Sequence, residues 1–420
     1  MATVKLSRLA ETLIASEIVR LGASIKEKIK AGQHIYNYTI GDFDSSQFAI
    51  PKVLEEEIIQ AYKDGYTAYP AAEGELDLRL AIADFIEEHL QIKYSPAEIL
   101  VSAGGRPLIY AVYRTIVDPG DKVIYPVPSW NNNHYVHFTE GEHVTIEATY
   151  ENNFMPTAAQ IEPHLKGASL LALCSPLNPT GTTFSEEELG AICDLVLQEN
   201  ASRKEGEKKL YLMYDQIYWT LTYGDTKHYN PVSLRPAMKE FTIFIDGISK
   251  AFAATGVRVG WALGPQDIIT KMRALSSHVG SWAPMAEQKA VARFLAQKEA
   301  VNSYLLNFRE EIELRLQQIY LGIKKLKQAG YKVDAVEPQA AIYLTLKFDL
   351  AGKNYSGKTL AQQADVTEYL LNEANLALVP FTAFGASNET SWYRLSVGTC
   401  HKNDIPEIMK KLEVALKKLA

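Results

Sequence analysis

The sequence predicts an α/β fold: a mostly parallel sheet with helices on both faces in a large domain, plus a smaller α+β domain. Three observations support this. Between about residues 98 and 263, short apolar runs alternate with helix-like stretches, which is typical of parallel sheets covered on both faces. From about residue 286 the pattern changes to long helices. A chain of 420 residues is also long enough for two cores.

Each apolar run of the first region is short enough to be a buried strand. The strands are expected at 98–102, 122–125, 143–146, 170–174, 210–214, 241–245 and 259–263, with helices at 108–117 and 186–198. A charged run at 203–209 is interpreted as a solvated loop. Later helices are expected at 287–297, 304–329 and 405–419, with a strand hairpin region between the last two.

These elements predict three segments of the chain. Residues 1–45 form an N-terminal arm and part of the small domain, and they pack with that domain or with a partner chain. Residues 46–285 form the large, ligand-binding domain, and residues 286–420 form the small C-terminal domain.

Composition narrows the classes of function. The net charge of −7 gives no basic surface for nucleic acid or for an anionic membrane. No apolar stretch reaches 18 residues, and the first 20 residues mix both charge signs, unlike a signal peptide. Three widely spaced cysteines predict reduced thiols and no metal site. We therefore expect a cytoplasmic protein that acts on small molecules.

The most informative residue is Lys250, which follows the run 241–245 and lies among small residues. A lysine in such a place can lose its proton and attack a carbonyl group. Arg258, eight positions later, can hold an anion such as a phosphate. The alternative is a surface lysine on a turn.

Other candidate residues follow the predicted strand ends, where ligands bind in parallel sheets. They are Gly104, Gly105 and Arg106 at a helix start, Trp130 after a proline-rich segment, Asn178 in a turn, Asp215 with Tyr218, and Arg394 inside an apolar strand of the small domain. Each alone also fits an ordinary role: a turn, core packing for Trp130, or an edge strand whose Arg394 faces water.

Pyridoxal phosphate together with an amino acid would use all of these residues. Lys250 would bond to the aldehyde, and Asp215 would pair with the protonated ring nitrogen. The other contacts are expected from Asn178 and Tyr218 to the phenolate oxygen, from Trp130 to the ring face, from Gly104, Gly105, Ser249 and Arg258 to the phosphate, and from Arg394 to the substrate carboxylate.

In their order and spacing, the motifs resemble the class I/II aminotransferases of the fold type I pyridoxal-phosphate enzymes, and among them the aspartate aminotransferases. The resemblance covers nearly the whole chain. It is carried by Tyr69…Gly74…Leu78-Arg79, Ser102-Ala103-Gly104-Gly105-Arg106, Asp118-Pro119-Gly120-Asp121, Ser175-Pro176-Leu177-Asn178-Pro179-Thr180-Gly181, Asp215-Gln216-Ile217-Tyr218, Ser249-Lys250 to Arg258, and Tyr393-Arg394-Leu395-Ser396.

The resemblance implies a transaminase that works as a homodimer with active sites at the subunit interface. Tyr69 would reach the phosphate bound in the partner subunit, and the backbone near Gly41 would touch the substrate carboxylate, with Asn178 and Trp130 also beside the substrate. Arg106 stands where some aspartate-type members use a lysine to bind the distal carboxylate. It binds either that group or the cofactor phosphate.

The resemblance favours aspartate or another acidic amino acid as donor and a 2-oxo acid such as 2-oxoglutarate as acceptor. Aromatic or aliphatic donors stay open, as do a C–S lyase, a decarboxylase and a non-catalytic binding module. The sequence departs from the family pattern at four places: Gly247, Val257, the segment 339–343, which lacks the usual glycine, and the loop 45–48. These departures concern the substrate range more than the cofactor.

Overall fold

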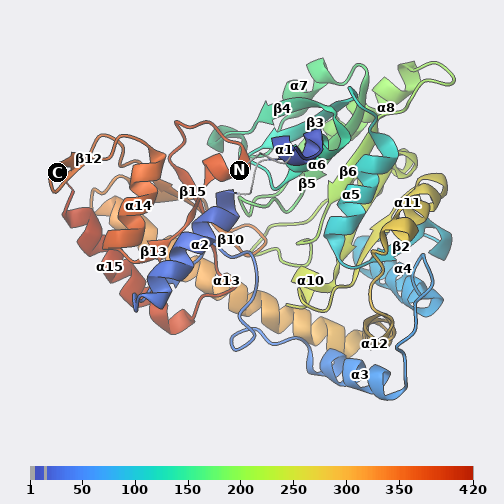
Figure 1. Cartoon of the computed structure of the whole chain (residues 1–420), viewed down its shortest axis with the longest axis horizontal. Coiled ribbons are helices and arrows are strands. Elements are labelled where there is room, and N and C mark those ends of the chain that lie inside the picture. The colour runs from blue at the N-terminus through green and yellow to red at the C-terminus, as the bar shows by residue number, and fades with distance from the viewer. Residues whose placement is uncertain (1–4, 14–16, 420) are drawn as a thin grey trace.

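A seven-stranded sheet forms the centre of the larger part of the computed structural model, which describes residues 5–13 and 17–419 (Figure 1). The strand order is β2-β8-β7-β6-β5-β3-β4, and β8 runs antiparallel to both of its neighbours while the other pairs are parallel. The strands are β2 (Ile99–Ser102), β3 (Lys122–Val127), β4 (Glu142–Glu147), β5 (Ala168–Cys174), β6 (Tyr211–Asp215), β7 (Thr242–Gly247) and β8 (Gly260–Leu263). All seven predicted strands, and the mostly parallel sheet, are confirmed.

Helices cover both faces of this sheet, as predicted. In β5, Leu170 packs into a core with helices α5 (Gly105–Ile116) and α11 (Gln266–Val279), whereas Leu171 packs into the opposite core with α4 (Leu76–Leu90) and α8 (Glu186–Ser202). Successive side chains of a strand point to opposite faces, so a strand buried on both faces must be apolar throughout. This is why the central strands β5, β6 and β7 are mostly apolar, whereas the edge strand β4 is largely exposed and carries polar side chains.

A smaller antiparallel sheet, β14-β15-β10-β9, forms the second part of the molecule. Its strands are β9 (Val333–Ala335), β10 (Tyr343–Phe348), β14 (Val379–Pro380) and β15 (Trp392–Ser396), and the helices beside it are α14 (Gln363–Glu373) and α15 (Ile405–Lys417). The predicted strand hairpin region and the terminal helix are thus present.

The long helix α13 (Lys298–Gln328) joins the two parts and runs diagonally through the lower half of Figure 1. Its Val301 belongs to the core of the large part, and Phe308 and the residues after it belong to the core of the small part. Before it, α12 (Met285–Leu295) packs on α3 (Lys52–Lys63) and α4. The domain limits after residues 45 and 285 stay a prediction.

The N-terminal segment packs on both parts. Helix α2 (Glu17–Lys30) buries Ile25 against Leu371 and Ala377, and β1 (Tyr36–Asn37) pairs in parallel with β13 (Leu376–Ala377). Helix α1 (Arg8–Thr12) touches α6 (Asn132–Thr139) through a 3.2 Å contact between Thr12 Oγ1 and His137 Nε2. Residues 1–4 and 14–16 of the predicted arm lie outside the described residues. The remaining short elements are α7 (Ala158–Ile161), α9 (Pro231–Leu234), α10 (Ile248–Ala251), β11 (Asn354–Tyr355) and β12 (Lys358–Thr359).

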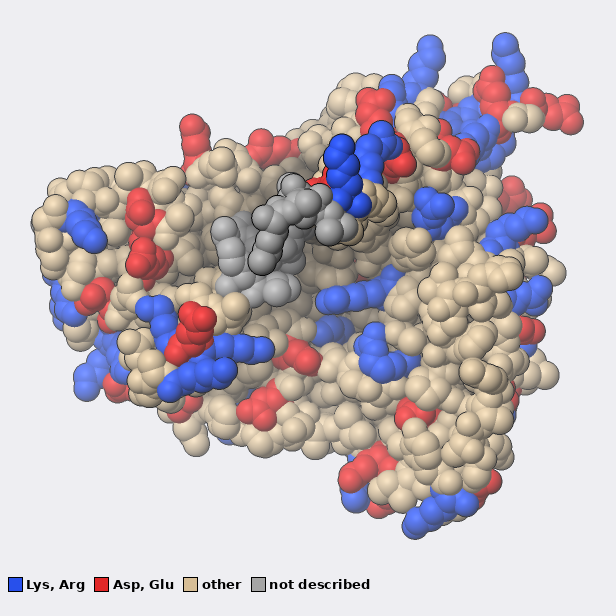
Figure 2. All heavy atoms as spheres, viewed as in Figure 1, with Lys and Arg blue, Asp and Glu red and all other residues tan. Residues whose placement is uncertain are grey.

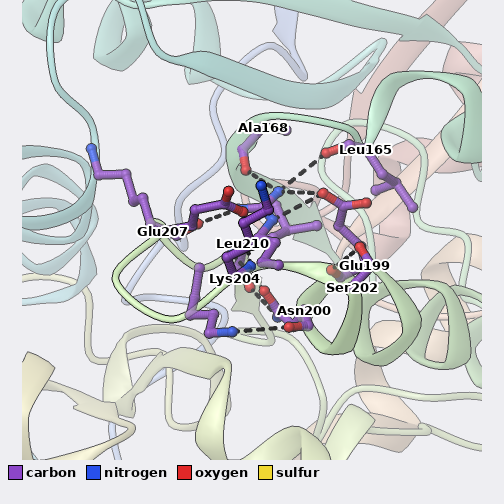
Figure 3. A network of polar contacts seen from close by, with 11 residues as sticks. Leu165, Ala168, Glu199, Asn200, Ser202, Lys204, Glu207 and Leu210 are labelled. Carbon is purple, nitrogen blue, oxygen red and sulfur yellow. Dashed lines mark hydrogen bonds and ion pairs between the residues drawn. The ribbon is translucent and has the colours of Figure 1, made fainter.

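The charged run 203–209 is only in part the solvated loop that its sequence predicts. Residues 204–208 are exposed, but Arg203 donates to the carbonyl oxygens of Leu165 (3.3 Å) and Ala168 (2.8 Å). Figure 3 shows this network, in which the Asn200 side chain also exchanges two 2.8 Å hydrogen bonds with the backbone of Leu210. The loop is therefore tied at its base, because buried backbone groups need partners.

Three observations bear on the other expectations. Cys174, Cys193 and Cys400 are free thiols. Within the described residues, no group of three or more His, Cys, Asp or Glu side chains is placed to hold a metal ion. The described helices also include none that is both long and apolar enough to cross a membrane.

Candidate active site

A cavity of about 840 Å³ lies where the large part, the small part and the N-terminal segment meet. Figure 2 shows the molecule hollowed between its two parts, with lysine and arginine atoms inside the hollow. The cavity brings together eleven of the predicted residues from distant places in the sequence: Gly41, Gly105, Arg106, Trp130, Asn178, Asp215, Tyr218, Ser249, Lys250, Arg258 and Arg394. Gly104 does not line the cavity but lies against the guanidinium of Arg258. Tyr69 lies outside the cavity.

Lys250 projects into the cavity from α10, the short helix that follows β7. Its Nζ donates a 2.5 Å hydrogen bond to the carbonyl oxygen of Gly41. Burial, aided by the nearby arginines and opposed by Asp42, lowers the pKa of this amine to about 8. A surface lysine on an open turn is therefore the wrong interpretation. About a tenth of the Lys250 amines are therefore neutral at pH 7, far more than for an ordinary lysine, and the neutral form is the one that acts as a nucleophile or accepts a proton.

Asp215 is the last residue of β6, and its neighbours across the sheet are Cys174 and Ile245. One carboxylate oxygen accepts a 3.1 Å hydrogen bond from the backbone N–H of Ile217. Burial raises the pKa of the carboxyl to about 6, and among the described residues no lysine or arginine forms an ion pair with it. A buried carboxylate is costly without a cationic partner, so the site suits a ligand that brings a protonated nitrogen.

Arg394 lies in β15, an interior strand of the small sheet, and is only 3% exposed. The interpretation as an edge-strand arginine that faces water is therefore wrong. Its guanidinium donates to Asn178 Oδ1 (2.9 Å) and to the carbonyl oxygen of Thr39 (2.7 Å), while its buried Nε has no hydrogen-bond partner among the described residues. Burial lowers the pKa of the guanidinium. A buried cation held by neutral groups suits an anionic ligand.

Arg258 and the start of α5 form a second anion-binding geometry. Arg258 has a left-handed backbone (φ 63°), and its guanidinium donates to the carbonyl oxygens of Thr255 (2.6 Å) and Ala103 (2.7 Å). A side chain at Gly104 would collide with that guanidinium, so glycine is required there. The free N–H groups of the first turn of α5, beginning at Gly105, add positive potential. Together these groups fit a phosphate.

Arg106 and Trp130 lie at the open side of the cavity. Arg106 is exposed, and its guanidinium carbon lies 4.7 Å from the centroid of a Trp130 ring. Arg106 therefore covers one face of the Trp130 indole, the side chain that the sequence predicts to stack on a ligand ring. Lys26 of α2 lines the same cavity and is also exposed. Sequence reasoning missed Lys26, because no local motif marks a helix residue that reaches a distant cavity.

Tyr343 belongs to the segment 339–343, which the sequence marks only for its missing glycine, and no role is predicted for Tyr343 itself. It lies in β10 and lines the cavity, and its hydroxyl is 2.6 Å from that of Tyr218. A buried tyrosine in a strand reads as ordinary core, and only the packing of the small domain on the large one exposes its role. Of the segment 339–343, which departs from the family pattern, only Tyr343 lines the cavity.

Tyr69 is 83% exposed and packs its ring edge against Trp282, with 5.3 Å between the ring centroids. It does not reach the cavity of its own chain. Its assigned contact with a phosphate stays a prediction, because that contact involves a second subunit.

Comparison with known proteins identifies the class of this molecule. The sequence pattern of the aminotransferase class I and II family matches residues 34–412. The chain belongs to this family and is therefore an enzyme of the transaminase class, whose substrates are amino acids and 2-oxo acids.

Similar proteins give a closer description. The chain is 31% identical to an aspartate aminotransferase of Bacillus sp. strain YM-2 over 97% of its own length and 98% of the relative. It is 32% identical to a probable aspartate/prephenate aminotransferase of Rickettsia felis, over 88% and 86% of the two chains. Among solved structures, aspartate aminotransferase from Thermus thermophilus with maleate has a TM-score of 0.87 at 27% identity, covering 98% of this chain and 100% of that one.

Proposed function

We propose that this chain is a pyridoxal-phosphate-dependent aminotransferase that takes its amino group from aspartate or another acidic amino acid. The 2-oxo acid acceptor is of the 2-oxoglutarate type. One observation carries the proposal: Lys250, a half-buried lysine with a lowered pKa, shares a cavity with the half-buried carboxylate of Asp215, which has no ion-pair partner among the described residues, and with a buried arginine, Arg394. The names of the similar proteins support the choice of an acidic donor.

The residues present fit the cofactor. The space that Gly104 leaves beside Arg258 and the start of α5 suit its phosphate. The buried Asp215 carboxylate suits a protonated ring nitrogen, and the Lys250 amine suits an aldehyde. When bound, pyridoxal phosphate supplies an aldehyde that bonds to amines and a ring that takes up electrons from the substrate α-carbon.

Each protein group has a task that follows from its surroundings. Asp215 keeps a proton on the ligand nitrogen beside it. Because Asn178 Oδ1 already accepts from Arg394, the N–H groups of its amide are left to donate to a ligand oxygen. Arg394, with its unpartnered Nε, binds the α-carboxylate of the substrate and fixes its orientation. The neutral Nζ of Lys250 accepts the α-proton and returns it at another carbon.

The open side of the cavity selects the substrate side chain. Arg106 and Lys26 bring two positive charges to it, which favours a donor with a second carboxylate. Trp130 is half-buried beneath Arg106 and keeps the guanidinium from turning freely into solvent.

We further propose a homodimer in which each active site uses both chains. The family resemblance supports this part, since it assigns Tyr69 to a phosphate in the partner subunit; here Tyr69 is 83% exposed and lies outside the cavity of its own chain, so a second chain could reach it. Mixing inactive Lys250→Ala chains with impaired Tyr69→Ala chains tests the idea. One of the two sites of a mixed dimer takes its intact Lys250 from the Tyr69→Ala chain and its intact Tyr69 from the Lys250→Ala chain, so activity should exceed that of both parents. No recovery after verified subunit exchange would contradict the shared site.

A panel of amino acids with 2-oxoglutarate tests the main proposal. We expect aspartate or glutamate to give the highest kcat/KM, and borohydride reduction followed by peptide mapping to find the cofactor on Lys250. An unmodified Lys250 in the reduced holoenzyme would sink the proposal. The cytoplasmic location expected from the thiol chemistry of the cysteines stays a prediction.

A further inference from the structure

Tyr343 joins three parts of the site that the sequence treats separately. Its hydroxyl lies 2.6 Å from the hydroxyl of Tyr218, and the two rings meet edge to face with 5.4 Å between centroids. The guanidinium carbon of Arg394 lies 4.6 Å from the centroid of the Tyr343 ring. A side chain at Gly41 would approach the Tyr343 hydroxyl to 2.6 Å, so this glycine lets the phenol and the Gly41 backbone lie side by side. Tyr218 and Tyr343 are each only 2% exposed.

The backbone around Tyr343 is fastened to the loops that carry Tyr218 and Asn178. Ala341 N donates to the carbonyl oxygen of Leu221 (2.8 Å), one turn after Tyr218. Thr345 Oγ1 donates to the carbonyl oxygen of Thr180 (2.8 Å), two residues after Asn178. These bonds hold strand β10 of the small sheet against the large part of the molecule. The distance between the two hydroxyls is therefore set by several contacts besides their own.

A single hydrogen atom lies between two hydroxyl groups that bond to each other, so one of the two donates and the other accepts. Burial raises the pKa of both phenols, but Arg394 opposes the rise most directly at Tyr343, whose ring it covers. The phenol beside the cation is the better donor. The hydroxyl hydrogen of Tyr218 is then free to point into the cavity.

We propose that Tyr343 is a positioning residue with two separable parts: its hydroxyl donates to Tyr218 and turns the Tyr218 hydroxyl toward the cofactor's phenolic oxygen, and its ring supports Arg394 beneath the substrate carboxylate. This inference rests on the proposed function, because it needs both cofactor and substrate. The Tyr343 hydroxyl should therefore affect the pH at which the bound cofactor gains or loses its proton, and the Tyr343 ring should affect the affinity for the substrate.

Two variants of the holoenzyme separate these parts. Tyr343→Phe removes only the hydroxyl. The pH midpoint of the cofactor's absorption change should rise by roughly 0.3–1 pH unit, since Tyr218 becomes a weaker donor to the phenolic oxygen. KM for the amino acid should stay within about twofold, because the ring beneath Arg394 remains. Tyr343→Leu removes the ring as well and should raise KM by roughly threefold to thirtyfold.

The double variant shows whether the hydroxyl acts through Tyr218. Tyr218→Phe alone should raise the midpoint more than Tyr343→Phe does, and adding Tyr343→Phe to it should cause no further shift. Tyr369→Phe is the matched control: it removes another buried hydroxyl of the small domain, bonded to the carbonyl oxygen of Ala415 at 2.6 Å, and should leave the midpoint unchanged.

The outcomes distinguish the inference from the proposed function. If the unaltered protein shows no pH-dependent cofactor absorption, the proposed function fails. If it shows one and Tyr343→Phe leaves the midpoint where it was, or shifts it additively with Tyr218→Phe, the positioning role of the hydroxyl is wrong. A KM in Tyr343→Leu equal to that of the unaltered enzyme would overturn the role of the ring.

Discussion

The two sides of the cavity hold their arginines in opposite ways. On the closed side, Arg394 is buried and fixed by two hydrogen bonds to neutral groups. On the open side, Arg106 and Lys26 are exposed, and with other described residues they form no hydrogen bond or ion pair. A buried charge interacts more strongly with a ligand, and the packing around it fixes its position, whereas water screens the interactions of an exposed charge. The closed side therefore suits groups that every substrate shares, and the open side suits the group that differs.

Lys250→Ala should have the largest effect, because it removes the amine at the centre of the closed side. We expect transamination to fall by more than about 10⁴-fold with every donor, since both the covalent attachment and the proton carrier are lost. Coupled assays of 2-oxo acid formation measure this. Lys271→Ala, an exposed lysine on α11, is the control and should keep full activity. A variant at 250 that retains a tenth of the rate would place the chemistry elsewhere.

Asp215→Asn should rank second. The amide keeps the shape of the side chain but not the charge that holds a proton on the ligand nitrogen, so kcat should fall by roughly 10²–10⁴-fold. The bound cofactor should remain detectable by its absorbance. Near-normal kcat in this variant would show that the buried carboxylate is structural and that the closed side has been interpreted wrongly.

The closed side is also the part that could be predicted best from sequence. Asp215 ends strand β6, and Lys250 lies in the short helix after the neighbouring parallel strand β7. The carboxyl ends of parallel strands lie at the same edge of a sheet, so the meeting of these two residues follows from local pattern and topology. Tyr343 and Lys26 could not be found in this way. Tyr343 comes from another sheet and Lys26 from a helix near the N-terminus, and only tertiary packing brings them to the cavity.

The sequence also did not predict which arginine side chains are exposed. Arg106 and Arg394 are both single arginines near apolar segments, yet one is exposed and the other is buried. The difference depends on whether a second element covers the residue. Strand β15 lies between β14 and β10, whereas the start of α5 faces the cavity mouth. Side-chain environment of this kind depends on long-range packing that a local pattern does not contain.

Arg394→Gln tests whether the closed side binds the group that all substrates share. Removing a buried cation from the closed side should cost every amino donor roughly 2–5 kcal/mol in kcat/KM, because the α-carboxylate is common to all of them. Aspartate, alanine and phenylalanine measured side by side should lose activity by similar factors. A loss confined to one donor would mean that Arg394 binds a side chain, and the roles of the two sides would then be exchanged.

The pH dependence of cofactor binding tests the electrostatics of the closed side. Because the pKa of Lys250 is lowered to about 8, its amine is protonated below that pH and neutral above it. The rate at which apoenzyme forms its covalent bond with pyridoxal phosphate should therefore rise about tenfold between pH 7 and pH 9 and then level off. A rate that still rises steeply above pH 9.5 would indicate a lysine with its ordinary pKa.

Arg106→Gln should have the smallest effect and the greatest selectivity. The side chain is exposed, so its attraction for a distal carboxylate is screened, and the loss for aspartate should be only about 1 kcal/mol, roughly fivefold in kcat/KM. Alanine and phenylalanine lack that carboxylate and should be unaffected, and cofactor retention during dialysis should hold. Lys26→Gln should lower kcat/KM for acidic donors in the same way if both cations bind the same carboxylate.

The other possible partner of Arg106 is the cofactor phosphate, and that case gives a different pattern: kcat/KM falls for all donors together, and the cofactor dissociates more readily. A uniform decline would thus remove the acidic-donor proposal and move Arg106 to the cofactor side of the cavity, while leaving the transaminase chemistry of Lys250 and Asp215 intact.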